Sequence, residues 1–545
     1  MQRTRGNIDV VLENRGPLIL RPNDHVATGG EGAVYKASNT IVKLYTDVNK
    51  MQKDDMMDKI KILSTFKHKF IVAPNGLVFS NMNIPLGFYM KFVKAEPLSR
   101  VFTNDFRKRE NFTDNNASVL VDGMREVVSF AHNKKAVLVD ANEMNWLVML
   151  SNQKDPEPRI IDVDSWAIGK WPAKVIMPSI RDWHANNFNQ STDWFAWGIV
   201  TFQIFTGIHP YKGRLKGYKP NDIERRMKKN ASVFSPNIRL NSAVRDFSTI
   251  PGPLLDWYVA TFQKGQRSIP PSPLQTGIAT TQLGRVMRVV ITASGTLTFN
   301  KLLDSTADPV IRIFPCGIVM SNSGKLLSLS NQRQISIAQS HKCEIVKVQN
   351  GWLKADVVDQ QIKFSYINEV SLEEIDMSLN LKTQQLVRYQ NRLFVVTERG
   401  LTEIILKVLG KPILSVGQTW GVMVNSTQWF DGVGIQDTLG AMYVVAPFND
   451  NSCVQIRVKE LDGLKPIVAK SGNRFIAVIA LDKTGAYQKI ELTMDRSYAN
   501  YKMAQGTVDV PELNIAILPK GVCSMIVNDG ELDIFVPTSG ILNKV

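Results

Sequence analysis

Apolar residues are spaced differently in the two halves of the chain. In the first half they recur at the 3.6-residue period of a helix, which predicts helices over two stretches. The second stretch ends at Gly207 and Pro210 and is apolar on all sides, so we expect it to be central to its domain. The two stripes consist of Val119, Leu120, Met124, Val127, Val128 and Ala131, and of Trp194, Trp197, Gly198 and Thr201 with flanking Ile and Phe.

The second half consists of short β-branched runs broken by Gly, Asn and Asp. Strand–turn–strand units centre on Gly324, Gly400, Gly485 and Gly540. Such units predict a β-propeller of about six blades with roughly 40–45 residues each. A β-sandwich or a stack of irregular β-modules is the alternative. This half has no clustered His, Cys or acidic ligands, so we expect it to bind a partner rather than to catalyse.

A proline-rich segment separates the two halves. Pro270, Pro271 and Pro273 fix φ and lack an N–H group, so neither a helix nor a central strand is expected here. We therefore predict a linker at 269–285 and a β-rich domain at 286–545.

The composition, with 44% hydrophobic and 21% charged residues, is that of a globular protein. No apolar stretch approaches the roughly 18 residues of a membrane span, and we expect neither a secretory signal nor a membrane partner. The four cysteines are far apart, which argues against a disulfide scaffold and against a CxxC zinc site: Cys316, Cys343, Cys453 and Cys523. These features predict a cytoplasmic location.

The positive charge is concentrated in the first half. The whole chain carries +15, and residues 1–270 hold 38 basic and 26 acidic residues, a net charge of +12. The segment 211–234 alone contains eight Lys or Arg. It predicts contact with an acidic protein substrate or assembly partner, and a nucleic-acid backbone is less favoured. A solvated surface is the plainer interpretation.

Two elements of the first half are typical of phosphate binding. Gly29, Gly30 and Gly32 lie in a predicted hairpin, where backbone N–H groups can approach phosphate oxygens without a Cβ clash. Lys43 lies in an apolar strand 11 residues after Gly32 and needs an anionic partner. An ordinary turn and an edge lysine are the alternatives.

Two further elements carry acids and amides. Asp140 is followed by Asn142 and Asn145 before an apolar strand, which predicts a base or orienting group beside a metal ligand. Asp162 and Asp164 alternate along the chain, an arrangement suited to Mg²⁺. Turn-capping acids are the alternative for either pair.

The order of these elements, together with the helix that begins near Asp193, resembles the protein kinase fold over about residues 20–270. The segment Asp162-Val-Asp-Ser-Trp166, which stands in place of the kinase Asp-Phe-Gly motif, is most similar to that of a divergent bacterial and phage subgroup of kinase-like proteins. The resemblance implies an α+β two-lobed domain, and with the β-rich pattern of the second half the expected fold class is an α+β two-lobed kinase-like domain followed by an all-β domain. It implies an N-terminal extension at 1–20, and a kinase-like domain at 21–268 with lobes at about 21–93 and 94–268.

The resemblance also implies an ATP- and Mg²⁺-dependent Ser/Thr phosphotransferase. Its catalytic residues are Asp140 as base, Asn142 and Lys43, with Asp193 as a structural residue. ATP is expected to contact Gly29, Gly30, Gly32, Val34, Lys43, Met90 and Phe92, and Mg²⁺ to be held by Asn145, Asp162 and Asp164.

The sequence departs from the kinase pattern in several places. Lys59 stands where a glutamate normally pairs with the strand lysine, and Asp55 or Asp58 is the expected substitute. Leu138 and Val139 replace His-Arg, and we expect Asp182 to pair with Arg267. A pseudokinase that acts as a structural or docking component of a larger assembly, such as a phage particle, is the alternative. The location would then be a virion, and small-molecule phosphorylation also stays open.

Overall fold

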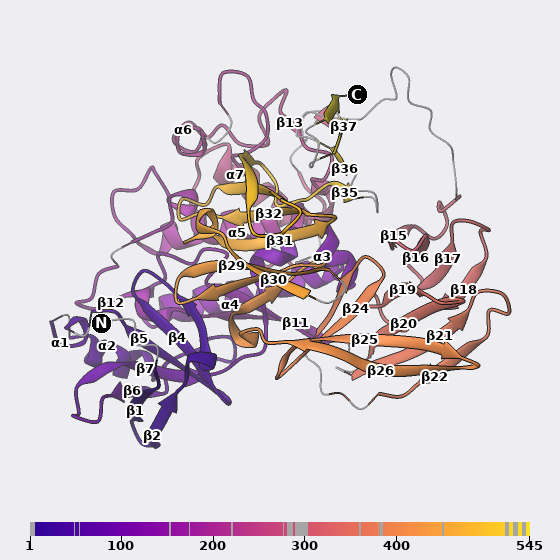
Figure 1. Ribbon diagram of the computed structural model, residues 1–545. Helices are drawn as coiled ribbons and strands as arrows, with labels where there is room; N and C mark the ends of the chain where they lie inside the picture. Colours follow the sequence, from indigo (N-terminus) through magenta and orange to yellow (C-terminus); the bar gives the residue numbers. More distant parts are fainter. Residues whose placement is uncertain are drawn as a thin grey trace.

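The computed structural model describes most of the chain (Figure 1). The described residues are 6–47, 49–53, 55–151, 154–173, 175–219, 222–275, 277–280, 287–288, 303–358, 361–379, 381, 385–449, 452–517, 523–526, 532–536 and 541–544. Gly540 and residues 276 and 281–285 of the predicted linker lie outside these ranges.

Strands from residues 8–45 and 76–91 form a seven-stranded antiparallel sheet in the order β2-β1-β6-β7-β5-β4-β3. Residues 8–20, assigned to an N-terminal extension from the sequence, form two of its strands, and Val11 of β1 pairs with Phe79 of β6. The strands are β1 (Ile8–Leu12), β2 (Gly16–Leu20), β3 (His25–Thr28), β4 (Gly32–Ala37), β5 (Thr40–Tyr45), β6 (Gly76–Phe79) and β7 (Pro85–Lys91).

Helices follow and interrupt this sheet, and the two helices predicted from apolar stripes are confirmed as α4 and α5. Thr113 and Asn189 cap them by accepting hydrogen bonds from backbone N–H groups of their first turns. The helices are α1 (Lys50–Lys53), α2 (Met56–Leu63), α3 (Asn104–Arg109), α4 (Asp114–Asn133), α5 (Gln190–Thr206), α6 (Ile223–Lys228) and α7 (Gly252–Phe262). None of the helices in the described part of the chain is both long enough and apolar enough to cross a bilayer.

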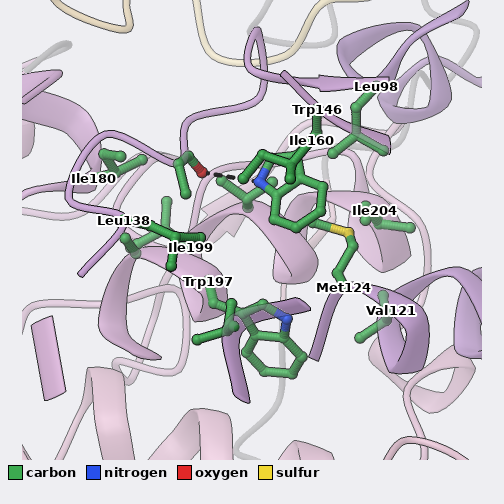
Figure 2. Packing of buried hydrophobic residues seen from close by; sticks show 14 of the residues in the cluster. Leu98, Val121, Met124, Leu138, Trp146, Ile160, Ile180, Trp197, Ile199 and Ile204 are labelled. Carbon is green, nitrogen blue, oxygen red and sulfur yellow. Dashed lines mark hydrogen bonds between the residues drawn. The ribbon is translucent and has the colours of Figure 1, made fainter. Parts of the chain in front are cut away.

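The largest hydrophobic core surrounds α4 and α5, and Figure 2 shows part of it. Trp146 is 1% exposed, and its Nε1 donates to the carbonyl oxygen of Ala141 at 3.2 Å. This core anchors both ends of the loop that joins Leu138 to Trp146. The loop is flanked by β9 (Ala136–Val137) and β10 (Trp146–Ser151). β12 (Ala167–Ile168) pairs with β9, and β8 (Glu96–Pro97) and β11 (Lys154–Ile160) pair with β10.

Six four-stranded antiparallel sheets follow one another after residue 303, each with its strands in chain order. Their strands are β15 (Val310–Ile313), β16 (Ile318–Ser321), β17 (Lys325–Ser328) and β18 (Gln334–Ile337); β19 (Glu344–Val348), β20 (Gly351–Val358), β21 (Gln361–Asn368) and β22 (Glu374–Met377); β23 (Gln385–Tyr389), β24 (Arg392–Thr397), β25 (Gly400–Leu409) and β26 (Lys411–Trp420); β27 (Thr427–Trp429), β28 (Gly434–Thr438), β29 (Ala441–Asn449) and β30 (Ser452–Arg457); β31 (Lys465–Gly472), β32 (Phe475–Leu481), β33 (Tyr487–Met494) and β34 (Tyr501–Val508); β35 (Ile515–Ile517), β36 (Cys523–Ile526), β37 (Leu532–Val536) and β38 (Ile541–Lys544). Two short strands, β13 (Arg239–Leu240) and β14 (Met287–Arg288), pair in parallel.

Consecutive sheets share hydrophobic clusters, and sheets β27–β30 and β31–β34 also lie against the first half of the chain (Figure 1). Arg100 donates to the carbonyl oxygen of Trp429 at 3.4 Å, and Lys470 forms an ion pair with Asp105 at 3.1 Å. The two halves are therefore in direct contact.

The fold class expected from the resemblance is wrong. Only 20% of the residues are helical and 39% are in strands, in several small antiparallel sheets, so the protein is mostly β with few helices rather than an α+β two-lobed domain followed by an all-β domain. Strands prevail because residues 8–45 and 76–91 pair as one antiparallel sheet and every sheet after residue 303 adds four more strands.

Candidate functional site

Lys43 and the Asp162–Asp164 pair come together although they are about 120 positions apart. Lys43 lies on β5, and its Nζ forms an ion pair with Asp162 and lies 3.0 and 2.9 Å from the two carboxylate oxygens of Asp164. The Asp164 side chain is 1% exposed, whereas that of Asp162 is 37% exposed. One carboxylate therefore fixes the lysine inside the protein while the other faces partly outward.

Two further side chains hold Asp164. The hydroxyl group of Tyr45 donates to Asp164 Oδ2 at 2.6 Å, and Lys59 Nζ of α2 donates to the Asp164 backbone carbonyl at 2.6 Å. Tyr45 lies two residues after Lys43 on the same strand, so both side chains lie on one face of the sheet.

The expected substitutes for the missing glutamate do not contact Lys43. Asp55 pairs with Lys170 at 2.6 Å on the surface, and Asp58 is exposed. Asp164, predicted as a metal ligand, instead supplies the buried carboxylate that Lys43 requires.

The electrostatics of the cluster follow from burial and proximity. Burial alone lowers the pKa of Lys43, but Asp164 and Asp162 outweigh burial and raise it. Burial and the neighbouring Asp164 charge raise the pKa of Asp162. Burial would also raise the pKa of Asp164, but Lys43 and the Tyr45 hydrogen bond lower it, so this carboxylate stays ionised.

Asp193, predicted as structural, holds the backbone that precedes Asp140. Its carboxylate accepts hydrogen bonds from the N–H groups of Leu138 at 2.8 Å and Val139 at 2.9 Å, and it contacts His132 Nε2 at 2.9 Å. Val139 has φ of +62°, which is unfavourable for a β-branched residue. The buried carboxylate therefore stabilises a strained turn directly before Asp140.

The loop from Asp140 to Asn145 is joined to the strand that leads to Asp162. Asn145 Nδ2 donates to the Asp140 carbonyl at 2.7 Å, and the Asn145 carbonyl accepts from Ile161 N–H at 2.9 Å. Asn142 is buried, and its Oδ1 accepts from Met144 N–H at 2.8 Å. Asn145 thus connects the backbone of Asp140 to the residue before Asp162.

The carboxylate of Asp140 is partly covered. Its Oδ1 accepts from Met177 N–H at 2.8 Å, and burial raises its pKa. A carboxylate of this kind can act as a base toward a hydroxyl group that reaches its second oxygen.

The glycine-rich turn joins β3 to β4. Gly29 N–H donates to the Gly32 carbonyl at 2.9 Å, and Gly29 and Gly30 are exposed. A Cβ atom at position 32 would lie 2.2 Å from the Leu44 carbonyl oxygen, so only glycine fits beside β5.

The other residues predicted to contact ATP lie around β5. Val34 of β4 is paired directly with Lys43, and Met90 of β7 is paired with Ile41 and buried. Phe92 follows β7, and its ring centroid lies 4.2 Å from Lys36 Nζ. The structure therefore brings Val34 next to Lys43, and it places Met90 and Phe92 at the end of the neighbouring strand.

In the described ranges, no three side chains of His, Cys, Asp or Glu gather as a metal-binding group. Mg²⁺ commonly uses one or two protein carboxylates and takes its other ligands from water and phosphate. Asp162, which is partly exposed, and Asn145 fit this requirement. Asp164 does not, because Lys43 and Tyr45 occupy its oxygens.

The expected pair of Asp182 and Arg267 is confirmed. Arg267 Nε and Nη2 donate to the two oxygens of Asp182 at 2.6 and 2.8 Å, so the pair is bidentate. It ties the segment before α5 to the chain that follows α7.

The basic segment 211–234 is only partly a surface. Lys212 and Arg226 are buried, and Lys212 Nζ lies 3.9 Å from the ring centroid of Tyr487 in the second half. The remaining six basic side chains are exposed: Arg214, Lys216, Lys219, Arg225, Lys228 and Lys229.

Sequence reasoning missed Tyr45, His132 and Met177. The spacing of Tyr45 from Lys43 was a usable signal, because alternate residues of a strand share a face. The contacts of His132 with Asp193 and of Met177 with Asp140 depend on tertiary structure and have no local signal. Neither a scan against models of protein families nor a search of curated proteins found a match to this chain.

Proposed function

We propose that the chain is an ATP- and Mg²⁺-dependent phosphotransferase of the Ser/Thr protein kinase type. The ion pair between Lys43 and Asp162, side chains 119 positions apart, is the observation that carries this proposal. Fold class does not determine activity, so the proposal rests on these side chains and not on the overall architecture.

The roles follow from the chemistry of each group. Lys43 would exchange a carboxylate for the phosphates of ATP, and Asp162 with Asn145 would hold Mg²⁺, which neutralises charge on the phosphates. Asp140 would accept the proton of the attacking hydroxyl group, and its raised pKa suits that role. Asp193 would keep Asp140 in position through the backbone of Val139.

The second half and the exposed basic residues are assigned to partner binding. Six exposed Lys and Arg side chains of segment 211–234 favour an acidic protein over an uncharged one. A cytoplasmic location, or a virion if the chain is phage-encoded, stays part of the proposal.

A second candidate is a docking protein without catalysis. It is favoured by the saturation of Lys43, whose charge is already balanced by two carboxylates, and by the contacts of the second half with the first. A structural role would explain why Lys59 occupies the position of the expected glutamate.

Transfer of label from γ-labelled ATP distinguishes the two candidates. The purified chain, Asp140→Asn and the control Asp155→Asn, an exposed acid away from the cluster, are incubated with Mg²⁺ and a mixture of Ser- and Thr-containing peptides. A kinase transfers label, and Asp140→Asn lowers the rate by about 10²-fold or more while Asp155→Asn does not. Absence of transfer, or equal transfer by Asp140→Asn, contradicts the proposed function.

A further inference from the structure

A turn of the second half lies against the segment that contacts Asp140. The turn between β32 and β33 contains Gly485, which has φ of +84°. A Cβ atom there would lie 1.9 Å from Ser179 Oγ and 3.4 Å from Met177 Sδ. The backbone of this turn is therefore in close contact with residues 177–179.

The same segment makes the hydrogen bond to Asp140. Met177 N–H donates to Asp140 Oδ1 at 2.8 Å, and the Ser179 carbonyl is fixed by His209 Nε2 at 2.9 Å. The β32–β33 turn thus packs on residues 177–179, and residues 177–179 in turn contact Asp140.

Sheet β31–β34 extends this contact on both sides. Met144, four residues after Asp140, and Met177 pack against its hydrophobic cluster. Tyr487 is 1% exposed, and its hydroxyl group donates to Gln203 Oε1 of α5 at 3.0 Å. The sheet therefore packs on both the Asp140–Asn145 loop and the segment that caps Asp140.

Several buried polar groups at this interface have no hydrogen-bond partner within the described part of the chain. Within the described residues, four buried polar atoms near it have no hydrogen-bond partner: Glu143 Oε2, Ser179 Oγ, Gln203 Nε2 and Lys212 Nζ. When the turn separates from residues 177–179, water can form hydrogen bonds with these polar groups. Those hydrogen bonds offset part of the free energy that is lost when the apolar contacts become exposed to water.

We propose that the β32–β33 turn, with sheet β31–β34, is an intramolecular cover on the acceptor side of Asp140. The proposal rests on the proposed function and adds its regulation. With the cover in place, Met177 N–H donates a hydrogen bond to one oxygen of Asp140. A protein acceptor must then compete with the chain's own second half for the space beside Asp140. Separation of the turn from residues 177–179 must precede transfer to a protein.

Gly485→Val in the full chain tests the cover, because a side chain at this position cannot fit against Ser179. Gly410→Val is the matched control, since Gly410 has φ of +78° in the β25–β26 turn and nothing lies within 4 Å of its Cβ position. Tyr487→Phe, which removes only the bond to Gln203, decides the question if Gly485→Val does not fold. Each variant is assayed for a thermal shift with Mg²⁺-ATP and for transfer of labelled phosphate to the Ser/Thr peptide mixture.

The cover predicts equal Mg²⁺-ATP shifts in all variants. It also predicts transfer that is faster by about tenfold in Gly485→Val, and faster by a smaller factor in Tyr487→Phe, but unchanged in Gly410→Val. The cover alone is overturned if the Mg²⁺-ATP thermal shifts are equal and Gly485→Val, or Tyr487→Phe where Gly485→Val does not fold, transfers phosphate no faster than wild type. Absence of any Mg²⁺-ATP shift in the wild type overturns the proposed function, and the cover falls with it.

Discussion

Lys43 Nζ lies 2.9 Å from Asp164 Oδ2 and 3.0 Å from Asp164 Oδ1, so a buried carboxylate holds the lysine with both of its oxygens. The carboxylate comes from the segment after β11 and not from helix α2. Lys59 of that helix instead binds the Asp164 backbone carbonyl. Two lysines and one tyrosine thus converge on a single aspartate.

Asp164→Asn should destabilise the protein because it leaves buried Lys43 with Asp162 as its remaining counter-charge. Breaking a buried ion pair costs about 3 kcal/mol in the free energy of unfolding. Denaturant-induced unfolding measures this loss, and the exposed-site variant Asp155→Asn should leave the midpoint unchanged. A stability equal to wild type would show that the pair contributes little.

Tyr45→Phe removes one hydrogen bond to the Asp164 carboxylate and little volume. The expected loss is about 1–3 kcal/mol in the free energy of unfolding, because the acceptor is charged and buried. Tyr35→Phe is the matched control, since Tyr35 packs against His25 on the neighbouring strand, away from this cluster. If both variants lose the same amount, the Tyr45–Asp164 bond is not the cause.

Asp193→Ala removes the acceptor for two buried backbone N–H groups. We expect a loss of about 3 kcal/mol in the free energy of unfolding, together with slower phosphotransfer, because the strained turn at Val139 is no longer held. Asp246→Ala, which removes an exposed acid that caps the Ser248 N–H group, should cost about 1 kcal/mol and leave transfer unchanged. Normal transfer by Asp193→Ala would contradict the positioning role of Asp193.

Glu143 makes the stability of the protein depend on pH. Burial raises its pKa from 4.5 to about 7, although nearby Lys212 opposes this increase. Between these values the folded protein binds the proton and the unfolded chain does not, so stability falls as pH rises from 4.5 to 7, by on the order of 3 kcal/mol.

Glu143→Gln should abolish this contribution. The difference in unfolding free energy between wild type and Glu143→Gln is expected to change across pH 4.5–7 and to be constant above pH 7. Glu373→Gln, an exposed change in the second half, controls for the loss of one carboxyl group. A difference that does not vary with pH would mean that the Glu143 carboxyl group is not desolvated.

The sequence indicated that Lys43 and Asp162 come together, but it did not indicate most of the contacts that hold them. The positions of Lys43, Asp140 and Asp162 follow from motif order along the chain, and the structure brings Lys43 to Asp162 and joins Asn145 to Asp140. The partner of Lys43 could not be predicted, because the distance from α2 to Asp164 depends on how the helix packs. Asp55 was expected near Lys43 from helical spacing, but its side chain pairs with Lys170 on the surface.

Individual helices and turns could be predicted where the spacing of apolar residues or of glycines was regular. The apolar stripes around Met124 and Trp197 predicted α4 and α5. Gly324 and Gly485 lie between paired strands as expected, and Gly400 is the first residue of β25. The predicted fold class was wrong because the resemblance implied a larger share of helix than the protein has, with 20% of its residues in helices and 39% in strands. Contacts between the halves, such as Tyr487 with Gln203, have no signal in the spacing of residues.

Equilibrium binding of ATP, with and without Mg²⁺, shows whether Lys43 and Asp162 form a nucleotide site. We expect Mg²⁺-dependent binding by the full chain and its loss in Asp162→Ala, because Asp162 is the partly exposed carboxylate beside Lys43. ATP binding that is absent, or that is equal in Asp162→Ala, would contradict a nucleotide site at Lys43 and Asp162.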